Sequence, residues 1–127
     1  MESRLQRVLV IDDHEDTLGL VALVLNGAGF EVRTSSHVDE IAASFGDWQP
    51  DVILTDVSMP GTSGVELCRL LKATYDTAHV PVVLFSSLPN EQLEALARTC
   101  EADGFLSKNA LAQLPRELAL LLDTMML

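Results

Sequence analysis

The side chains best able to do chemistry in this chain follow short apolar runs, at the point where each run ends. They are three carboxylates, hydroxyl groups and one ammonium group, and the residues are Asp12, Asp13, Asp56, Ser86, Ser87 and Lys108. Carboxylates that lie close together repel one another, so at neutral pH they either share a proton or hold a cation. Because the ligands on offer are hard oxygens, without a cluster of thiols or imidazoles, the pattern favours Mg²⁺.

A cation held by only two or three protein oxygens keeps coordination positions open for the oxygens of a phosphate group. Lys108 could bring a second positive charge to the same anion, and Ser86 could give it a hydrogen bond. A carboxylate beside the cation and the ammonium group would then be a nucleophile that accepts a phosphoryl group. Taken singly, such residues are often only helix caps, turn residues or solvated side chains. Their joint placement favours the chemical interpretation.

Apolar runs and amphipathic stretches alternate along the chain, and this alternation predicts the elements that bring those residues together. Mainly apolar runs, typical of central strands buried on both faces, occupy residues 8–11, 51–56, 80–85 and 104–106. An alternating run, typical of an edge strand, occupies residues 30–34. Helical spacing with start and stop signals predicts helices at residues 17–28, 37–45, 63–75, 91–100 and 111–127.

Strict alternation of strand and helix predicts a doubly wound α/β fold, in which one five-stranded parallel sheet has five helices on its two faces, in three layers. One such domain fills residues 1–127. In a parallel sheet the carboxyl ends of the strands lie along one edge, and ligands bind there where the strand order reverses. We therefore expect the polar residues that follow the four predicted central strands to converge on one rim.

Composition argues against several classes of protein. Eight basic residues against nineteen acidic ones give a formal net charge of −11, whereas proteins that bind nucleic acid present a basic face. We therefore expect no direct binding to nucleic acid. The chain shows neither the layout of a signal peptide nor the roughly 20 apolar residues of a membrane span, so we expect a cytoplasmic protein without membrane contact. Cys68 and Cys100 are typical of buried thiols in a reducing compartment.

Four places in the chain match one set of motifs: Asp12 with Asp13, the segment DVSMPGTSG that begins at Asp56, Ser86 with Ser87, and Phe105 followed three residues later by Lys108. Together they resemble the receiver domain of two-component response regulators. The resemblance covers residues 8–122, nearly the whole chain. It implies a flavodoxin-like fold with strand order 2-1-3-4-5. It also implies a stand-alone, chemotaxis-type receiver without a fused output domain.

The resemblance implies how the acidic residues work. Asp56 would accept a phosphoryl group from the phosphohistidine of a sensor histidine kinase or a histidine phosphotransfer protein. Asp13 and Asp56 would bind Mg²⁺ directly, Asp12 through water and Ser58 through its backbone carbonyl. The chain would catalyse only its own phosphorylation and dephosphorylation, so it would not be an enzyme with an external substrate.

The resemblance also implies which groups bind and sense the phosphoryl group. Ser86, Ser87 and Lys108 would bind it. Ser86 would move toward it and Phe105 would rotate into the vacated space, and this switch would bias the surface of the fourth and fifth helices toward a downstream partner. Asn109 is a departure, because relatives usually have a cis proline there. A cis bond without proline costs about 2.5–4 kcal/mol, so we expect either a trans bond with a shifted loop or a strained cis bond.

Two other functions are compatible with the sequence. In the first, the receiver fold binds a protein partner constitutively, without phosphorylation. The complete set of carboxylates, serine and lysine weighs against this function, and Asn109 is the point in its favour. In the second, the chain is a metal-dependent phosphatase with an aspartyl nucleophile. Such enzymes usually carry a second acid two residues beyond the nucleophile, where this chain has Ser58.

Some residues near the site and the chain end have plain interpretations. We expect His14 to be a solvated residue at the start of the first helix rather than a metal ligand, and His79 to be exposed. In the last helix, three apolar residues lie off the stripe that packs in the core, and they are Leu120, Met126 and Leu127. They form either a frayed end or a surface for a homodimer or another partner.

Overall fold

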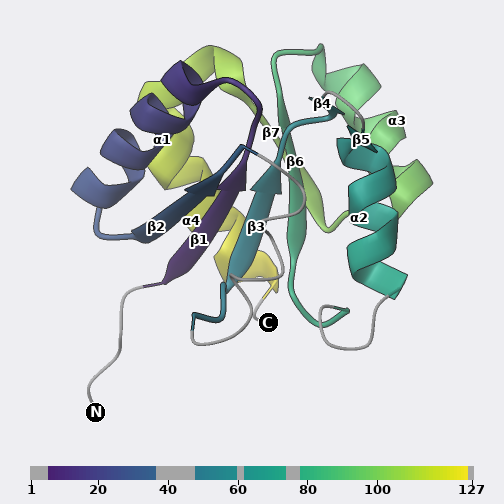
Figure 1. Ribbon diagram of the computed structural model, residues 1–127, viewed down its shortest axis with the longest axis horizontal. Helices are drawn as coiled ribbons and strands as arrows, with labels where there is room; N and C mark the ends of the chain where they lie inside the picture. Colours follow the sequence, from purple (N-terminus) through teal and green to yellow (C-terminus); the bar gives the residue numbers. More distant parts are fainter. Residues whose placement is uncertain (1–5, 37–47, 60–61, 74–77, 126–127) are drawn as a thin grey trace.

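The computed structural model describes residues 6–36, 48–59, 62–73 and 78–125, and its centre is a five-stranded parallel sheet (Figure 1). In spatial order the strands are β2 (Glu31–Ser35), β1 (Arg7–Ile11), β3 (Val52–Thr55), β6 (Val82–Ser86) and β7 (Gly104–Ser107). This is the order 2-1-3-4-5 expected for the five strands of the main sheet. The predicted doubly wound fold is therefore confirmed.

Helices cover both faces of the sheet (Figure 1). The further elements are α1 (Glu15–Gly27), the antiparallel pair β4 (Ser58–Met59) and β5 (Thr62–Ser63), α2 (Gly64–Ala73), α3 (Asn90–Cys100), the 3₁₀ segment η2 (Lys108–Gln113) and α4 (Leu114–Met125). Helices α1 and α4 pack on one face of the sheet, and α2 and α3 pack on the other. In β1, Val10 packs in the core under α1 and α4, and Leu9 packs in the core under α2 and α3. Because both faces of β1 are buried, its sequence is an uninterrupted apolar run.

One strand predicted to be central lies at an edge. Among the described strands, β7 pairs only with β6, on the side of the sheet opposite β2. The prediction is wrong because both faces of β7 are covered: Leu106 packs in the α1 and α4 core, and Phe105 packs against the α2 and α3 core. An edge strand covered on both faces is as apolar as a central one, so its composition does not distinguish them. The alternating strand β2 is at an edge, as predicted.

The helices agree with the predictions except near two segments. The helix predicted at residues 37–45 lies outside the described residues. The last helix begins at Leu114 rather than at residue 111, because η2 precedes it and Ala110 has non-helical angles, φ −136° and ψ 65°. Pro115 lies in the first turn of α4, where its missing N–H costs nothing. All peptide bonds of the described residues are trans, including Lys108–Asn109, so the strained cis alternative is wrong, and the accompanying shift of the loop stays a prediction.

The two cysteines are buried, as predicted. Cys68 of α2 donates through its Sγ to the backbone carbonyl of Cys100 in α3, over 3.5 Å. Burial, reinforced by the neighbouring Cys100, raises the pKa of the Cys68 thiol to about 12. The Cys68 thiol is therefore almost entirely protonated at neutral pH. Both cysteine side chains belong to the core between the sheet, α2 and α3.

Two predictions about exposed side chains are confirmed. Leu120 is 59% exposed on α4, and His79 is exposed before β6. Met126 and Leu127 lie outside the described residues. Across the described part of the chain, every helix is too short or too polar to cross a lipid bilayer.

Candidate functional site

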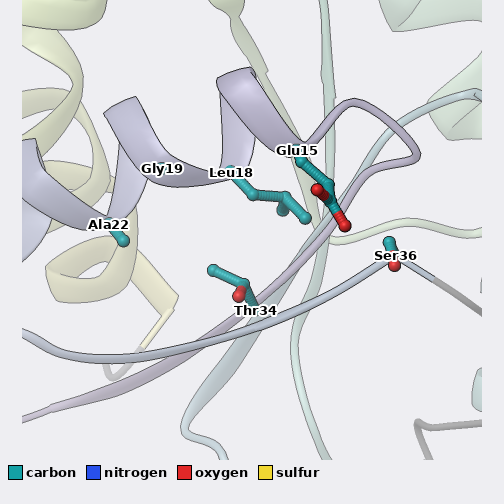
Figure 2. Close-up of a pocket in the computed structure, with 6 residues that line it drawn as sticks. All are labelled: Glu15, Leu18, Gly19, Ala22, Thr34 and Ser36. Atoms are coloured by element: carbon teal, nitrogen blue, oxygen red, sulfur yellow. The ribbon is translucent and has the colours of Figure 1, made fainter.

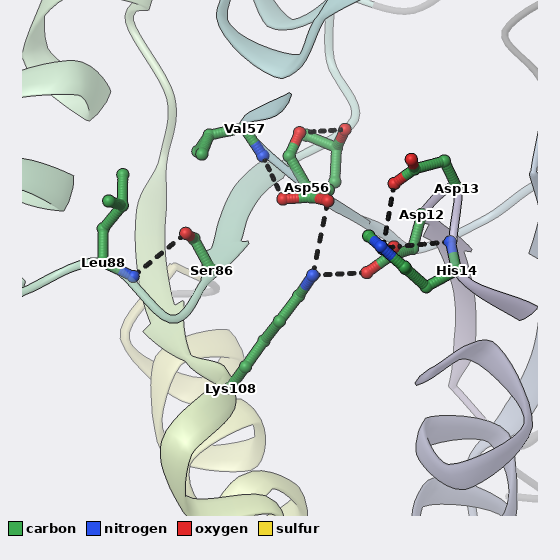
Figure 3. Close-up of polar contacts among 9 residues, drawn as sticks. Asp12, Asp13, His14, Asp56, Val57, Ser86, Leu88 and Lys108 are labelled. Atoms are coloured by element: carbon green, nitrogen blue, oxygen red, sulfur yellow. Dashed lines mark hydrogen bonds and ion pairs between the residues drawn. The ribbon is translucent and has the colours of Figure 1, made fainter. Parts of the chain in front are cut away.

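The carboxyl ends of the strands meet at one edge of the sheet, as the sequence predicts. Ile11 of β1 lies opposite Thr55 of β3, and Ser86 of β6 lies opposite Ser107 of β7. The polar residues that end or directly follow these strands therefore lie on one rim, and they are Asp12, Asp13, Asp56, Ser86, Ser87 and Lys108. Figure 3 shows these side chains, except that of Ser87, with the polar contacts that they make.

Asp56 is buried at the end of β3, with 7% of its surface exposed. Its backbone N–H donates to the carbonyl of Ile11 over 2.9 Å, and its Oδ1 accepts from the N–H of Val57 over 2.8 Å. Gly64, the first residue of α2, packs directly against this backbone. A Cβ atom at Gly64 would lie only 1.7 Å from the carbonyl oxygen of Asp56. The glycine at the end of the DVSMPGTSG segment thus lets α2 approach the buried aspartate.

Lys108 joins two aspartates that come from different strands. Its Nζ donates a hydrogen bond to Oδ2 of Asp12 and lies 3.4 Å from Oδ2 of Asp56. Only 17% of the lysine side chain is exposed, and Nζ also lies 5.6 Å from the centre of the Phe85 ring. Figure 3 shows the side chain extending from the end of β7 toward the two carboxylates. One ammonium group therefore serves two buried acids.

Asp12 has a side chain with no exposed surface. Burial by itself would raise the pKa of this carboxyl group. The hydrogen bond from Lys108 and the hydrogen bond from the backbone N–H of His14, 3.0 Å long, lower the pKa and outweigh burial. The pKa of Asp12 therefore lies below its ordinary value, and the group is ionised at neutral pH.

Asp13 and His14 complete the cluster. Oδ1 of Asp13 is buried and accepts no hydrogen bond. Nδ1 of His14 lies 3.1 Å from this oxygen, without the alignment of a hydrogen bond, and 3.2 Å from Oδ1 of Asp12. His14 directly precedes α1 and its side chain is 69% exposed, which confirms a solvated residue at the helix start. Its contact with both carboxylates was not predicted, and the only signal for it is its place directly after the acidic pair.

The donor atoms of the cluster suit a divalent cation. One ligand atom from each of Asp12, Asp13, His14 and Asp56 lies within 4.8 Å of the others. A buried carboxylate oxygen without a hydrogen bond, and three carboxylates near a single lysine, leave negative charge that a hard cation would neutralise. These residues therefore fit a Mg²⁺ site. Ser58 begins β4, two residues beyond Asp56, and the role of its carbonyl stays a prediction.

The remaining predicted site residues lie on β6 and β7 or just beyond them. Ser86 is buried, and its Oγ accepts a hydrogen bond from the N–H of Leu88 over 3.1 Å. Ser87 is exposed, and its carbonyl accepts from the side-chain amide of Asn109 over 3.4 Å. Phe105 is half-buried in β7. The structure thus places both serines on the rim, whereas their part in phosphoryl binding and the switch of Ser86 and Phe105 stay predictions.

A shallow groove lies beside this cluster, between the first half of α1 and the end of β2 (Figure 2). Its volume is about 290 Å³, and its lining residues are Glu15, Leu18, Gly19, Ala22, Thr34 and Ser36. These residues include neither a predicted phosphoryl ligand nor a member of the acidic cluster. The chemistry of the site therefore belongs to the rim of the sheet and not to this groove.

The doubly wound sheet, with three aspartates and a lysine at its carboxyl edge, places the chain among receiver-like α/β domains. The family model of the response regulator receiver domain matches residues 8–119, and the chain belongs to this family. The resemblance drawn from the motifs is thereby confirmed.

Curated relatives extend well beyond the matched region. The phosphate regulon transcriptional regulatory protein PhoB of Pseudomonas aeruginosa is 31% identical over 101 residues, which are 80% of this chain and 44% of PhoB. The response regulator PleD of Caulobacter vibrioides is 36% identical over 102 residues, which are 80% of this chain and 22% of PleD. The chain thus spans less than half the length of these relatives, and the similarity concerns only part of each.

Solved structures support the fold. The chemotaxis response regulator CheY4 of Vibrio cholerae superposes with a TM-score of 0.81 at 24% identity, over 92% of this chain and 98% of CheY4. NtrX from Brucella abortus superposes with a TM-score of 0.81 at 28% identity, over 94% of this chain and 27% of NtrX. The first similarity shows the fold alone, and the second again matches one part of a longer protein.

Proposed function

We propose that the chain is a phosphorylation-controlled switch of a two-component system and that Asp56 is its phosphoacceptor. The observation that carries this proposal is the setting of Asp56, which is buried at the end of β3 with Nζ of Lys108 3.4 Å from its Oδ2. Two further carboxylates lie beside it, so the site pairs a nucleophile with groups that bind a cation and an anion. The donor would be the phosphohistidine of a sensor histidine kinase or of a histidine phosphotransfer protein.

During transfer, the bond between phosphorus and the donor imidazole nitrogen breaks, and a bond forms between phosphorus and a carboxylate oxygen of Asp56. The N–H of Val57 fixes the carboxylate of Asp56 by its hydrogen bond to Oδ1. The residues that would hold Mg²⁺ are Asp12, Asp13, Asp56 and, through its carbonyl, Ser58. When bound, the ion supplies positive charge to the oxygens of the transferred group.

Lys108 would change partners when the phosphoryl group arrives. In the structure it donates to Asp12, which carries a single negative charge. A phosphoryl group on Asp56 brings about −1.5 to −2 charges and three acceptor oxygens, so it competes strongly for the same ammonium group. Ser86 accepts a hydrogen bond from Leu88 through Oγ, which leaves its hydroxyl hydrogen to donate to a phosphoryl oxygen.

The surface controlled by this switch would lie on α3, β7 and α4, where α3 and α4 are the fourth and fifth helices of the sequence-based prediction. Movement of Ser86 toward the phosphoryl group would let Phe105, half-buried in β7, rotate inward. Leu120 is exposed on α4, and it offers apolar surface to a downstream partner or a homodimer. The net charge of −11 supports a protein partner rather than nucleic acid.

Intact mass spectrometry after incubation with Mg²⁺ and acetyl phosphate tests this function. We expect one added phosphoryl group on the wild type, and none after chelation of Mg²⁺ or in Asp56→Asn. Asp123→Asn, which changes an exposed aspartate of α4, is the matched control and should be phosphorylated like the wild type. Because small donors fail with some acceptors, the reaction is repeated with a phosphorylated histidine kinase. Absence of an adduct with both donors would favour the phosphorylation-independent interaction module.

A further inference from the structure

His14 lies beside the proposed cation site and has no part in the function proposed above. Its Nδ1 is 3.1 Å from Oδ1 of Asp13 and 3.2 Å from Oδ1 of Asp12. A carboxylate oxygen of Asp56 completes a group of four donor atoms that lie within 4.8 Å of one another. Figure 3 shows the ring close to the carboxylates of Asp12 and Asp13. The cluster therefore contains an imidazole nitrogen as well as oxygens.

We propose that His14 is a further ligand of the cation and that it shifts the preference of the site from Mg²⁺ toward first-row transition-metal dications. This inference rests on the proposed function, because it concerns the same site. Mg²⁺ takes oxygen ligands, whereas imidazole nitrogen suits ions such as Ni²⁺ and Fe²⁺. For a site of three carboxylates and one imidazole, affinity rises from Mn²⁺ through Co²⁺ to Ni²⁺. Without the imidazole, the site would discriminate less between these ions and Mg²⁺.

The local backbone keeps the ring at the cluster. The N–H of His14 donates to Oδ1 of Asp12 over 3.0 Å, and the extended backbone of His14, φ −98° and ψ 108°, precedes α1. Because 69% of the side chain is exposed, core packing does not fix its torsion angles, and the ring can adjust toward an ion. Oδ2 of Asp12 is already bonded to Lys108, so Oδ1, the oxygen beside His14, is the one that faces the cluster.

Isothermal titration calorimetry of the untagged protein with Ni²⁺ and, separately, with Mg²⁺ tests the proposal. Mildly alkaline buffer is used because protons compete with metal for imidazole. We expect His14→Ala to weaken Ni²⁺ binding by about tenfold and to change Mg²⁺ binding by less than about twofold. His79→Ala removes another exposed histidine, which precedes β6 and is not part of the acidic cluster, and it should leave both affinities unchanged.

A spectroscopic measurement separates ligation from simple charge effects. Electron spin echo envelope modulation of bound Mn²⁺ detects a coordinated nitrogen, and we expect the nitrogen coupling in the wild type and in His79→Ala but not in His14→Ala. Wild-type Mn²⁺ spectra without nitrogen coupling, or equal weakening of Ni²⁺ and Mg²⁺ by His14→Ala, would overturn the proposal.

Failure of this proposal is distinguishable from failure of the proposed function. If the wild type takes up a phosphoryl group with Mg²⁺ and His14→Ala retains full Ni²⁺ affinity, the ligand role of His14 is rejected and the switch function stands. If the wild type binds no cation and gains no phosphoryl group, both are rejected.

Discussion

The two ends of the parallel strands both carry charged residues, but they arrange them differently. At the amino end, Nε of Arg7 and Nε1 of Trp48 both donate to Oε2 of Glu31, over 2.7 and 2.8 Å. The guanidinium groups of Arg7 and Arg33 lie 5.7 and 4.8 Å from the centre of the Trp48 ring. Asp51 accepts a hydrogen bond from the backbone N–H of Arg7 over 2.8 Å. Charges of both signs are thus matched, and this end is organised for stability.

At the carboxyl end, one lysine pairs with two of three clustered carboxylates, those of Asp12 and Asp56, and Oδ1 of Asp13 is buried without a hydrogen bond. Repulsion among these acids costs stability, and a bound cation or a phosphoryl group would change the balance of charge. The comparison teaches that charge alone does not identify a functional end of this sheet. The informative feature is charge that the protein itself leaves uncompensated.

The greatest loss of stability should follow a change at the carboxyl end that touches no charge. In Gly64→Ala, the new Cβ would lie 1.7 Å from the carbonyl oxygen of Asp56, so α2 or the end of β3 must move. We expect the free energy of unfolding in urea to fall by about 3 kcal/mol, together with loss of phosphorylation. Gly19→Ala is the control: a Cβ at this helical position has no atom within 4 Å, and it should raise stability by about 0.5–1 kcal/mol. Equal effects of the two changes would contradict the close approach.

Removal of the shared lysine should cost less. Lys108→Met leaves the buried carboxylate of Asp12 without its ammonium partner. Because the lysine is 17% exposed and water can replace part of the interaction, we expect a loss of about 2 kcal/mol in chelator-treated protein at neutral pH. Urea unfolding followed by circular dichroism measures this difference.

The pH dependence of the same variant should change sign. In the wild type the pKa of Asp12 is below its unfolded value, so its ionised form stabilises the fold above that value, about 3.9, and this contribution is lost as the pH falls through the folded pKa. Without Lys108, burial of Asp12 dominates and raises its pKa. The contribution of Asp12 to the stability of Lys108→Met should therefore increase as the pH falls from 7 toward 4. A parallel pH dependence of the two proteins would show that Lys108 does not determine the charge state of Asp12.

Relief of repulsion should produce a smaller, opposite effect. Asp13→Asn removes one of three neighbouring negative charges, and we expect a gain of about 1 kcal/mol in the presence of chelator. Added Mg²⁺ should stabilise the wild type more than the variant, because a ligand that binds only the folded state raises its stability. Thermal unfolding with and without Mg²⁺ measures both differences. A less stable Asp13→Asn protein under chelating conditions would show that the cluster is not under electrostatic strain.

A substitution at the amino end of the strands, where the charges are matched, should change stability but not phosphorylation. Glu31→Gln weakens the ion pair with Arg7 while keeping an oxygen that can accept from Trp48. Since Glu31 is 45% exposed, we expect a loss of only about 0.5 kcal/mol, which urea unfolding can detect, and unchanged phosphorylation by acetyl phosphate. Slower phosphorylation of this variant would mean that the two ends of the sheet are coupled.

Much of this arrangement could be predicted because it depends on strand ends. Residues that end or directly follow buried parallel strands must lie along one edge, so periodicity alone predicts that Asp12, Asp56 and Lys108 lie on one rim. The edge position of β7 could not be predicted in this way. Because α3 and α4 cover its two faces, β7 carries apolar residues, Phe105 and Leu106, as a central strand does.

Other features depend on distances that no local pattern contains. The contact of His14 with two carboxylates follows from the torsion angles of one exposed side chain, and exposed residues are usually solvated. Gly64 was included in the motif, but its need for a missing Cβ depends on how closely α2 approaches Asp56. The late start of α4 arises because Ser107 accepts from the N–H of Asn109 over 3.0 Å, a local bond that favours a 3₁₀ turn.

The central claim is that Asp56, and no other carboxylate of the acidic rim, accepts the phosphoryl group. Borohydride reduction of the phosphorylated protein converts an acyl phosphate to an alcohol, so a phosphorylated aspartate becomes homoserine, and peptide mass spectrometry then locates it. We predict homoserine at position 56 alone, in wild type treated with Mg²⁺ and phosphodonor. Homoserine at Asp12 or Asp13, or at none of the three positions in protein that carries the added mass, would contradict this account.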